Sequence, residues 1–545
     1  MLLIECNKIK KYFGDRLILD IEKLRIYSED RIGIVGINGA GKTTLINILS
    51  KRLESDEGWV KSYGKHGYIS QLESPDNNII SAEIASKFGI ESNWNDKMSG
   101  GEKTRFKLAG ALDNKSAIIF ADEPTSNLDI EGIELLEEKL SDYNGGLILI
   151  SHDRNFLDKL CNKIIEIENG KIEIYNGNYS FYRNQKNQEK ERVRFEYEEY
   201  IKEKKRLEEV IKEKKQKSKS IKRAPKRMGN SEARLHKMGG QKAKANLDRA
   251  VKNVKKRIEN LETKEKPIGQ SGIKLDIMDS NKLHSKIIIE GKNINKKFEE
   301  KIIFKNAEFN IYNNAKIALI GPNGCGKTTL INMILNNENN IKVAKGAKIG
   351  YFSQDMNILK NNLSIIENVM ESSIYPESFA RLLLARLLFK GETIYKKIDV
   401  LSGGERVKVS FAKILLQDIN LLILDEPTNY IDINALEVIE ETLKEYDRTL
   451  LFVSHDRKFV EAVANQIMTI EDKKIKIFMG TYKEYLSRKN NLNRNKEDRA
   501  TKIILLENRL SEVIGKLSMP AKQNDLEILN EEYNEIVEEL KRLKN

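Results

Sequence analysis

The chain of 545 residues contains the same series of short motifs twice, and this duplication limits the folds that it can adopt. Residues 31–49 and 316–335 both run from an apolar stretch through G-x-x-x-x-G-K-T into a second apolar stretch. The spacing of the two copies is far longer than a solenoid unit, so we interpret them as a duplicated domain. Each copy is expected to be an α/β domain in which a strand leads through a glycine-rich loop into a helix.

Three further blocks repeat in the same order: the SGGE segments, the apolar strands that end in Asp-Glu, and the S-H-D-R segments. The glycine-rich loops begin at Gly36 and Gly321, and the SGGE segments begin at Ser99 and Ser402. The stretch from loop to SGGE is therefore shorter in the first domain than in the second. We expect a short helical subdomain there, with no inserted arm.

A strongly basic segment lies between the two copies. The whole chain has 94 Lys and Arg against 82 Asp and Glu, a net charge of +12. Residues 184–266 hold 28 of the basic and 14 of the acidic residues, so the remainder has 66 against 68 and is nearly neutral. A run of charge is often only a solvated helix face, but its position between two repeated domains favours a polyanionic partner.

The basic segment also has the periodicity of two antiparallel helices. Pro225, Gly239 and Gly240 are helix breakers, and they predict an irregular tip at about 221–240. Further along, a Glu-, Lys- and Leu-rich stretch broken by Pro520 predicts an appended helical hairpin. Apolar residues at steps of three and four predict the seam of the linker pair, with Leu247, Val251, Val254, Ile258 and Leu261 on one helix and Leu207, Val210 and Ile211 on the other.

These patterns divide the chain into four parts. We expect α/β domains at 1–183 and 286–488, a basic helical linker at 184–285 between them, and a helical extension at 489–545. The three cysteines are widely spaced, which favours a reducing compartment over a disulfide framework or a metal site. No apolar run approaches the roughly 20 residues of a membrane span, so we expect a cytoplasmic protein without signal peptide or membrane helix.

The glycine-rich loops predict phosphate binding. Their glycines let backbone N–H groups surround phosphates at a helix N-terminus, the lysine reaches the β- and γ-phosphates, and the threonine hydroxyl ligates Mg²⁺. Two copies in a strand–loop–helix context disfavour a simple glycine-rich turn. The predicted nucleotide-binding residues are Gly36, Asn38, Gly39, Gly41, Lys42, Thr43 and Thr44 in the first loop and Gly321, Asn323, Gly324, Gly326, Lys327, Thr328 and Thr329 in the second, with Thr43 and Thr328 also as Mg²⁺ ligands.

Paired carboxylates at the ends of apolar strands predict hydrolysis. Asp122 and Asp425 end such strands and are expected to hold Mg²⁺, directly or through water. Glu123 and Glu426 follow them and are expected to orient or deprotonate the attacking water. A solvated acidic pair is the alternative, and the buried character of the preceding strands disfavours it.

Further residues of each copy can complete such a site. His152 and His455 follow a second apolar strand, where they can contact the γ-phosphate, and their duplication disfavours a purely structural role. Gln71 and Gln354 are expected to reach Mg²⁺ or the attacking water. Aromatic residues of an N-terminal strand are often core residues, but the two that precede the glycine-rich loops at equal spacing are expected to stack on the base, namely Phe13, for which Tyr12 is a substitute, and Phe298.

This set of motifs resembles the ATP-binding-cassette (ABC) ATPases, and two cassettes with a basic helical linker and no membrane domain resemble the ABC-F family over residues 1–488. The resemblance implies two P-loop nucleotide-binding domains, paired head to tail within a monomer, with two ATP molecules at their interface. Each ATP is then held by one glycine-rich loop and the opposite SGGE signature. Lys42 would face Ser402, Gly403 and Gly404, and Lys327 would face Ser99, Gly100 and Gly101.

The resemblance also implies a partner, the 70S ribosome, whose 23S rRNA and P-site tRNA the linker would contact after entering the tRNA exit site toward the peptidyl-transferase centre. The long linker, short first cassette and C-terminal extension are similar to the Vga and Vml types, which protect against lincosamides, pleuromutilins and streptogramin A. A housekeeping translation factor for stalled or initiating ribosomes is the alternative. A transporter ATPase subunit or a DNA-repair ATPase fits the linker less well. The candidate RNA-contacting residues are Lys222, Arg223, Lys226, Arg227, Arg234 and Lys237.

Overall fold

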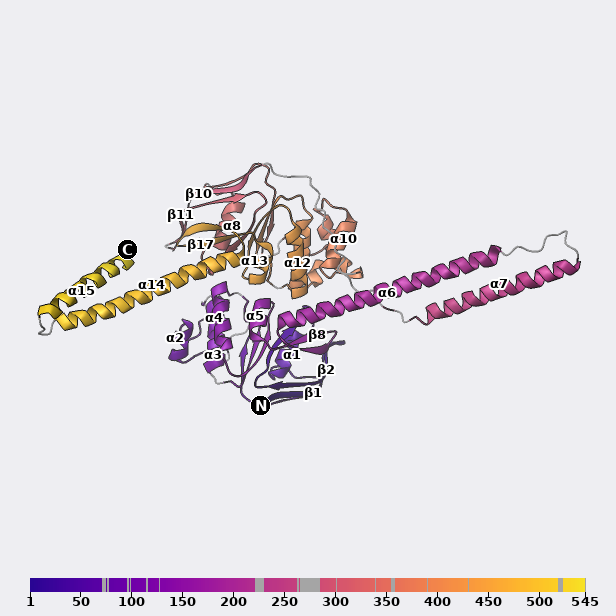
Figure 1. The fold of residues 1–545 in the computed structure, drawn as a ribbon, viewed down its shortest axis with the longest axis horizontal. Coiled ribbons are helices and arrows are strands. Elements are labelled where there is room, and N and C mark those ends of the chain that lie inside the picture. Colours follow the sequence, from indigo (N-terminus) through magenta and orange to yellow (C-terminus); the bar gives the residue numbers. More distant parts are fainter. Residues whose placement is uncertain are drawn as a thin grey trace.

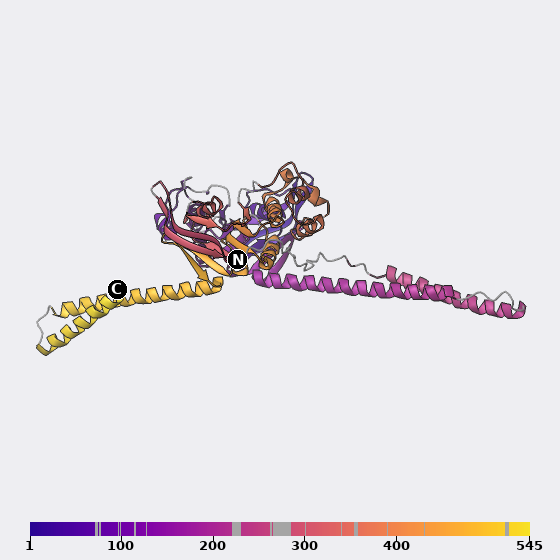
Figure 2. The same cartoon turned by 90° about the horizontal axis from the view of Figure 1, so that it is seen from above.

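Two α/β domains form the body of the molecule, and a helical hairpin extends from it on either side, in opposite directions (Figures 1 and 2). The structure is a computed structural model. It describes residues 1–70, 75, 78–95, 98, 100–113, 116–126, 128–220, 230–261, 264, 285–299, 301–338, 340–353, 358–389, 391–429, 431–517 and 523–544, with side chains described there except at 230–241, 492–501, 516–530 and 544.

The first domain is built on a mainly parallel sheet whose central strands are buried. Its described strands lie in the order β5-β6-β7-β3-β8-β9, and a second, antiparallel sheet has the order β2-β1-β4. Every residue of β6 and β7 is buried, as expected of strands covered on both faces. The elements are β1 (Leu2–Phe13), β2 (Arg16–Tyr27), β3 (Arg31–Val35), α1 (Lys42–Leu49), β4 (Glu57–Ser62), β5 (His66–Ile69), α2 (Ala82–Phe88), α3 (Gly100–Asp113), β6 (Ile118–Asp122), α4 (Ile130–Ser141), β7 (Gly146–Ile150), α5 (Arg154–Leu160), β8 (Lys163–Glu168) and β9 (Lys171–Asn176).

The second domain repeats this architecture. Its described strands lie in the order β14-β15-β16-β12-β17-β18, beside an antiparallel sheet of order β11-β10-β13. The elements are β10 (Ile287–Phe298), β11 (Lys301–Tyr312), β12 (Lys316–Ile320), α8 (Lys327–Leu335), β13 (Ile341–Val343), β14 (Ile349–Phe352), α9 (Ile365–Met370), α10 (Glu377–Arg386), η1 (Gly391–Tyr395), η2 (Ile398–Val400), α11 (Gly403–Leu415), β15 (Leu421–Asp425), α12 (Ile433–Glu445), β16 (Thr449–Val453), α13 (Arg457–Val463), β17 (Gln466–Glu471) and β18 (Lys474–Met479).

The helical subdomains of the two domains differ in size. Between β14 and α11 the second domain contains α9, α10, η1 and η2, whereas the described residues between β5 and α3 of the first domain contain only α2. The shorter first subdomain agrees with the spacing of the repeated motifs. In both domains the subdomain leads into the helix that starts at the SGGE signature, α3 or α11.

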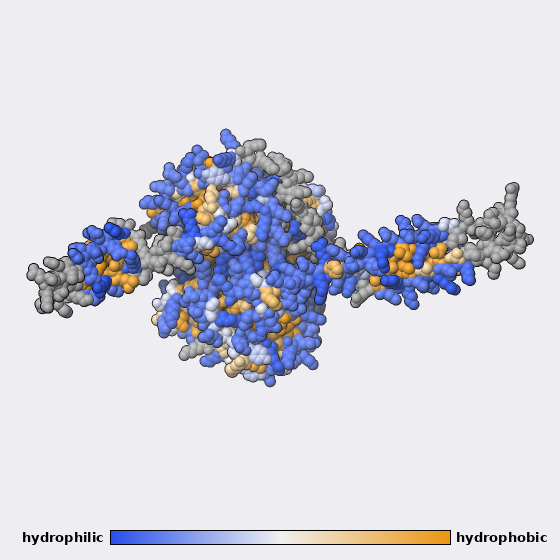
Figure 3. All heavy atoms as spheres, in the orientation of Figure 1, coloured by the Kyte–Doolittle hydropathy of each residue, from blue (hydrophilic) through white to orange (hydrophobic). Residues whose placement is uncertain are grey.

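The linker is an antiparallel hairpin of α6 (Tyr179–Ser220) and α7 (Asn230–Glu259). At 42 residues, α6 is about 63 Å long, since an α-helix rises about 1.5 Å per residue. Leu207 and Val251, both predicted in the seam, are buried, and the Ser218 hydroxyl donates to Asp248 Oδ1 at 3.0 Å. Figure 3 shows a strip of apolar side chains along this hairpin, while most of the visible surface of the molecule is hydrophilic.

One prediction about the linker is wrong. Gly239 and Gly240 were expected to interrupt the helix, but the backbone is helical from Asn230 onward and both glycines lie inside α7. A glycine inside a helix costs about 1 kcal/mol relative to alanine, so it weakens a long helix without ending it. The remainder of the predicted tip, 221–229, lies outside the described residues.

The C-terminal extension is the predicted second hairpin, formed by α14 (Tyr482–Leu517) and α15 (Gln523–Lys544). Its small core contains Val513, Ile536 and Leu540. The first turn of α14 belongs to the second domain, because Tyr482 packs in that domain's core. The hairpin therefore continues directly from the body.

Candidate active site

Each glycine-rich loop joins a buried strand to a helix through a left-handed turn. Gly41 and Gly326 precede α1 and α8 with φ of +101° and +111°, a conformation that side chains other than glycine rarely adopt. In the first loop the Lys42 ammonium donates to the carbonyl of Gly36 at 2.8 Å, and in the second Lys327 donates to that of Gly321 at 2.8 Å. The first N–H groups of an α-helix have no acceptor within the helix, so the starts of α1 and α8 are suited to bind an anion.

The two carboxylates at each strand end have different surroundings. Asp122, buried at the end of β6, accepts a hydrogen bond from Thr43; burial and the adjacent Glu123 raise the pKa of Asp122 to about 6. In the second domain burial raises the pKa of Asp425, and the hydrogen bond from Thr328 opposes this rise. A hydroxyl beside a carboxylate is a set of hard oxygen donors, the kind that Mg²⁺ prefers.

The glutamates turn away from these aspartates toward the histidines. Glu123 and Glu426 have φ of 49° and 50°, which is uncommon outside glycine and typical of strained functional positions. The His152 Nε2 atom lies 3.2 Å from Glu123 Oε1, and His455 Nε2 lies 3.2 Å from Glu426 Oε1. Burial raises the pKa of Glu426 to about 7.

Both histidines are held in the neutral form. Burial lowers the pKa of His152, and burial together with the nearby Lys327 lowers the pKa of His455 to about 4. A neutral imidazole has one donor and one acceptor nitrogen. Each histidine can therefore donate a hydrogen bond to a phosphate oxygen or to its glutamate without adding a charge to the site.

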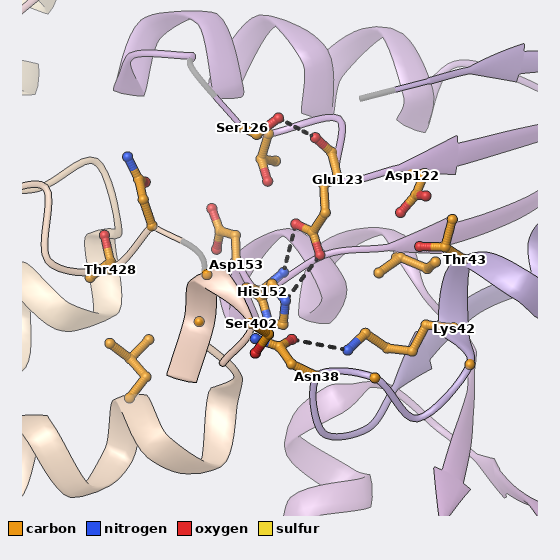
Figure 4. Close-up of a pocket in the computed structure, with 18 of the residues that line it drawn as sticks. Asn38, Lys42, Thr43, Asp122, Glu123, Ser126, His152, Asp153, Ser402 and Thr428 are labelled. Carbon is orange, nitrogen blue, oxygen red and sulfur yellow. Dashed lines mark hydrogen bonds and ion pairs between the residues drawn. The ribbon is translucent and has the colours of Figure 1, made fainter. Parts of the chain in front are cut away.

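The loop of the first domain and the signature of the second domain line one cavity of about 600 Å³. Figure 4 shows Lys42, Thr43, Asp122, Glu123 and His152 of the first domain around this cavity, with Ser402 of the second domain close to His152. The predicted facing of Lys42 with Ser402, Gly403 and Gly404 is present in the structure. The residues that line the cavity are Phe13, Ile18, Asn38, Gly39, Gly41, Lys42, Thr43, Thr44, Asp122, Glu123, Thr125, Ser126, Ile133, Ile150, His152, Asp153, Ser402, Gly403, Gly404, Thr428, Asn429, Leu436, His455 and Asp456.

Two aspartates that the sequence interpretation left without a role connect the domains at these sites. Asp129, the N-cap of α4, accepts a hydrogen bond across the interface from the backbone N–H of Asn323 at 2.8 Å. Asp432, the N-cap of α12, lies 2.7 Å from Lys408 Nζ and interacts electrostatically with Lys42. Both aspartates end a repeated segment, SNLD or YID, so their equivalent positions were a signal for a shared role.

The remaining predicted residues have different outcomes. Phe13 lines the cavity with its ring half exposed, and the Phe298 ring is equally exposed, with Lys296 Nζ 5.8 Å from its centre. Gly100 and Gly101 begin α3, whereas Ser99, Gln71 and Gln354 lie outside the described residues. The same holds for Lys222, Arg223, Lys226 and Arg227, and for the side chains of Arg234 and Lys237 on α7.

Comparisons with known proteins agree with this geometry. A family described as ABC transporter matches 19–88 and 304–429, and an extension family with the same description matches 165–275. ABC transporter F family member 2 of Arabidopsis thaliana is 28% identical, over 88% of this chain and 78% of that protein. Erythromycin resistance ATP-binding protein MsrA of Staphylococcus epidermidis is 34% identical, over 85% and 96%. Ribosome protection protein VmlR of Bacillus subtilis (strain 168) is 31% identical, over 99% and 98%. The chain belongs to the ABC-F family.

As an ABC-F protein with two cassettes, the chain is an ATPase. The fold is also that of an archaeal ribosome recycling factor solved with a ribosomal stalk protein, with a TM-score of 0.58 over 88% of this chain and 92% of that one. At 18% identity this likeness concerns the fold alone. None of the helices in the described part of the chain combines the length and apolar character that crossing a membrane requires.

Proposed function

We propose that this ABC-F ATPase binds the 70S ribosome and protects it from antibiotics, by inserting the linker through the tRNA exit site toward the peptidyl-transferase centre. The observation that carries the proposal is a strongly basic helical hairpin fixed between two cassettes that share an ATP site. Residues 212–257 contain 18 basic and 3 acidic residues. The names of two relatives, one a ribosome protection protein and one an erythromycin resistance protein, support the same function.

The hairpin suits an RNA target on physical grounds. Phosphate backbones attract closely spaced Lys and Arg, and the release of counterions makes such binding strong and dependent on salt. The seam buries only a narrow strip between α6 and α7, so most basic side chains of the described shaft face solvent. We propose that the tip, with Lys222, Arg223, Lys226, Arg227, Arg234 and Lys237, contacts 23S rRNA and P-site tRNA.

In the proposed reaction each glycine-rich loop binds the phosphates of one ATP and the opposite Ser-Gly-Gly closes the site. Lys42 and Lys327 neutralise the β- and γ-phosphates, and Phe13 and Phe298 stack on the bases. Thr43, Asp122 and Gln71, or Thr328, Asp425 and Gln354, would hold Mg²⁺, which would offset the negative charge of the phosphates during hydrolysis.

Glu123 and Glu426 orient the attacking water and accept its proton. Burial raises the pKa of Glu426 to about 7, close to neutral pH, which suits a general base. His152 and His455 lie 3.2 Å from these glutamates and donate to the γ-phosphate, so each histidine aligns the phosphate with the water.

Ribosome trapping tests the partner. A variant with Glu123→Gln and Glu426→Gln binds ATP but does not hydrolyse it, so it should sediment with 70S ribosomes through a sucrose cushion when ATP is present. A matched variant with Lys42→Ala and Lys327→Ala should stay in the supernatant, because it loses the phosphate-binding ammonium groups. If the glutamine variant and the alanine variant sediment equally little, the ribosome is not the partner.

Minimum inhibitory concentrations test the protective role and the drug class. Expression of the gene in a susceptible host should raise the values for lincomycin, tiamulin and virginiamycin M. A rise for erythromycin alone would instead assign the macrolides, and unchanged values for all four drugs would favour the housekeeping translation factor. Deleting 222–238 should abolish protection and leave ATP hydrolysis intact, since the described part of this segment, 230–238, lies at the end of the hairpin that is far from both cassettes (Figure 1).

A further inference from the structure

Helix α12 of the second cassette reaches one ATP site with its first turn. Its N-cap Asp432 is buried 2.7 Å from Lys408 Nζ and interacts electrostatically with Lys42 and His152 of the first cassette. Lys42 and His152 line the cavity that also contains Ser402. A displacement of α12 relative to the first cassette therefore changes the charge beside this particular ATP site.

Two turns further along, α12 is fixed to the loop that carries His152. Arg154 follows that histidine closely in the sequence and forms a two-pronged ion pair with Glu440, with Nη1 3.1 Å from Oε2. The two side chains are only 8% and 9% exposed, so the pair cannot separate without leaving a desolvated charge. Movement of the histidine loop and movement of α12 are thus tied together.

Between these two contacts, α12 also holds the base of the linker. Glu437 forms an ion pair with Arg183, in the second turn of α6. Beside it, Asp158 of the first cassette accepts hydrogen bonds from the backbone N–H and hydroxyl of Ser180, each at 2.6 Å, and forms an ion pair with Lys458 of the second cassette at 2.9 Å. The base of the linker is therefore bound to both cassettes.

The other half of the molecule repeats the first two contacts. Helix α4 starts after Asp129, which accepts from Asn323 at the second glycine-rich loop, and Glu137 forms the same two-pronged ion pair with Arg457. Asp129, Glu137 and Arg457 occupy the positions in the repeat that are equivalent to the α12 contacts. Each ATP site thus has a helix from the opposite cassette fixed to its histidine loop.

The contact with the projecting helix is not repeated. The residue equivalent to Arg183 is Leu486 in α14, which cannot form an ion pair with α4. Among the described residues, the ion pair that joins α4 to α14 is Lys489 with Glu131, at 3.6 Å and with side chains 46% and 68% exposed. Solvent screens such a pair strongly. Of the two described ion pairs, the partly buried one, Arg183–Glu437, therefore joins the opposite cassette to the linker and not to α14.

We propose that α12 couples the ATP site at Lys42 to the linker through the Glu437–Arg183 ion pair, and that the site at Lys327 drives the linker only indirectly. The inference rests on the proposed function and adds that ATP binding draws the two cassettes together and so moves the linker. Closure at the Lys42 site draws α12 toward the first cassette, and Glu437 carries the start of α6 with it. Arg183 and Glu437 are positioning residues that touch neither nucleotide nor metal.

The test measures linker position in the isolated full-length protein by pulsed electron paramagnetic resonance. Spin-labelled unnatural residues replace the exposed Lys202 on α6 and the exposed Lys345 in the second cassette, in the hydrolysis-deficient Glu123→Gln, Glu426→Gln background. ATP should shift the distance distribution. Arg183→Gln should remove most of that shift, and the charge swap Arg183→Glu with Glu437→Arg should restore it, which a merely misfolded variant would not do.

Matched variants complete the test. Lys489→Gln, which breaks the exposed pair at α14, should leave the linker shift intact. Lys42→Ala should abolish the shift, and Lys327→Ala should retain part of it. The inference is overturned if Arg183→Gln behaves like its parent, if the two lysine variants lose the shift equally, or if ATP shifts nothing in the parent. Ribosome sedimentation is measured separately, so failure here leaves the proposed function standing.

Discussion

The two cassettes share their proposed catalytic residues and differ in what those residues are attached to. Glu123 and Glu426 adopt the same unusual backbone conformation and lie at the same 3.2 Å from their histidines. The first cassette, however, continues into α6 with the Arg183–Glu437 pair, and the second continues into α14, where leucine replaces that arginine. The comparison shows that short local motifs determine the geometry of the two sites. We propose that single contacts at the domain edge determine which projecting helix moves with each site.

The largest effect should come from removing the residues that the cassettes share. The double variant Glu123→Gln, Glu426→Gln should reduce ATP turnover by about 10²–10⁴-fold, the usual contribution of a general base. Phosphate release under saturating ATP measures this. Each single variant should keep turnover from the remaining site. Glu138→Gln, at an exposed surface position, should match the unaltered protein. Normal turnover in the double variant would show that other residues activate the water.

Variants of the two buried ion pairs test whether each pair stabilises the interface between the cassettes by the same amount. Removing one partner of a buried pair costs about 3–5 kcal/mol, because it leaves an uncompensated charge. Glu440→Gln and Glu137→Gln should both lower the midpoint of the first urea transition. Glu137→Gln should do so more, because Glu137 also pairs with Lys159 at 2.5 Å. An unchanged midpoint in both variants would show that these ion pairs do not contribute to the stability of the interface.

A pH titration of stability compares the two histidines. Burial lowers the pKa of His455 from 6.5 to about 4, so between these values the unfolded chain binds a proton that the folded chain does not. The free energy of unfolding should therefore decrease by up to about 3 kcal/mol as the pH falls from 6.5 to 4, at about 1.4 kcal/mol per pKa unit. Urea unfolding without nucleotide measures it. His455→Gln should flatten this part of the profile, as should His152→Gln, whose histidine is shifted in the same direction.

The residues of the proposed ATP sites could be predicted from local motifs. The contacts between the two cassettes could not be predicted in this way. Lys42 and Glu123 could be predicted because the spacing of each motif fixes a strand, a turn and a helix. The facing of Lys42 with Ser402 came from resemblance to a family, since no local pattern joins residues so far apart. Arg154 and Glu440 gave no signal at all, because an arginine after S-H-D and a glutamate inside a helix are individually ordinary.

In the linker, a local sequence signal led to a wrong prediction. Gly239 and Gly240 were given too much weight as helix breakers, whereas α7 continues through both. Their local preference is small beside the pairing of α7 with α6, in which Leu207 and Val251 are buried. The periodicity of apolar residues predicted the hairpin correctly, because this periodicity extends over a long segment. The point at which the helix starts depends on packing that single residues do not reveal.

The smallest expected effect compares the two glycines that precede α1 and α8. Alanine in the left-handed conformation costs about 1–2 kcal/mol. At Gly41 the added Cβ would lie 2.9 Å from Ile18 Cγ2, and at Gly326 it would lie 2.4 Å from Ile303 Cγ2, so both sites must adjust and the second must adjust more. Gly326→Ala should therefore lower the thermal midpoint and the ATP affinity more than Gly41→Ala. Gly515→Ala, in the open space of α14, should be neutral or slightly stabilising. Equal losses in the two loops would show that the backbone conformation alone sets the cost, and that the loops are more alike than their surroundings indicate.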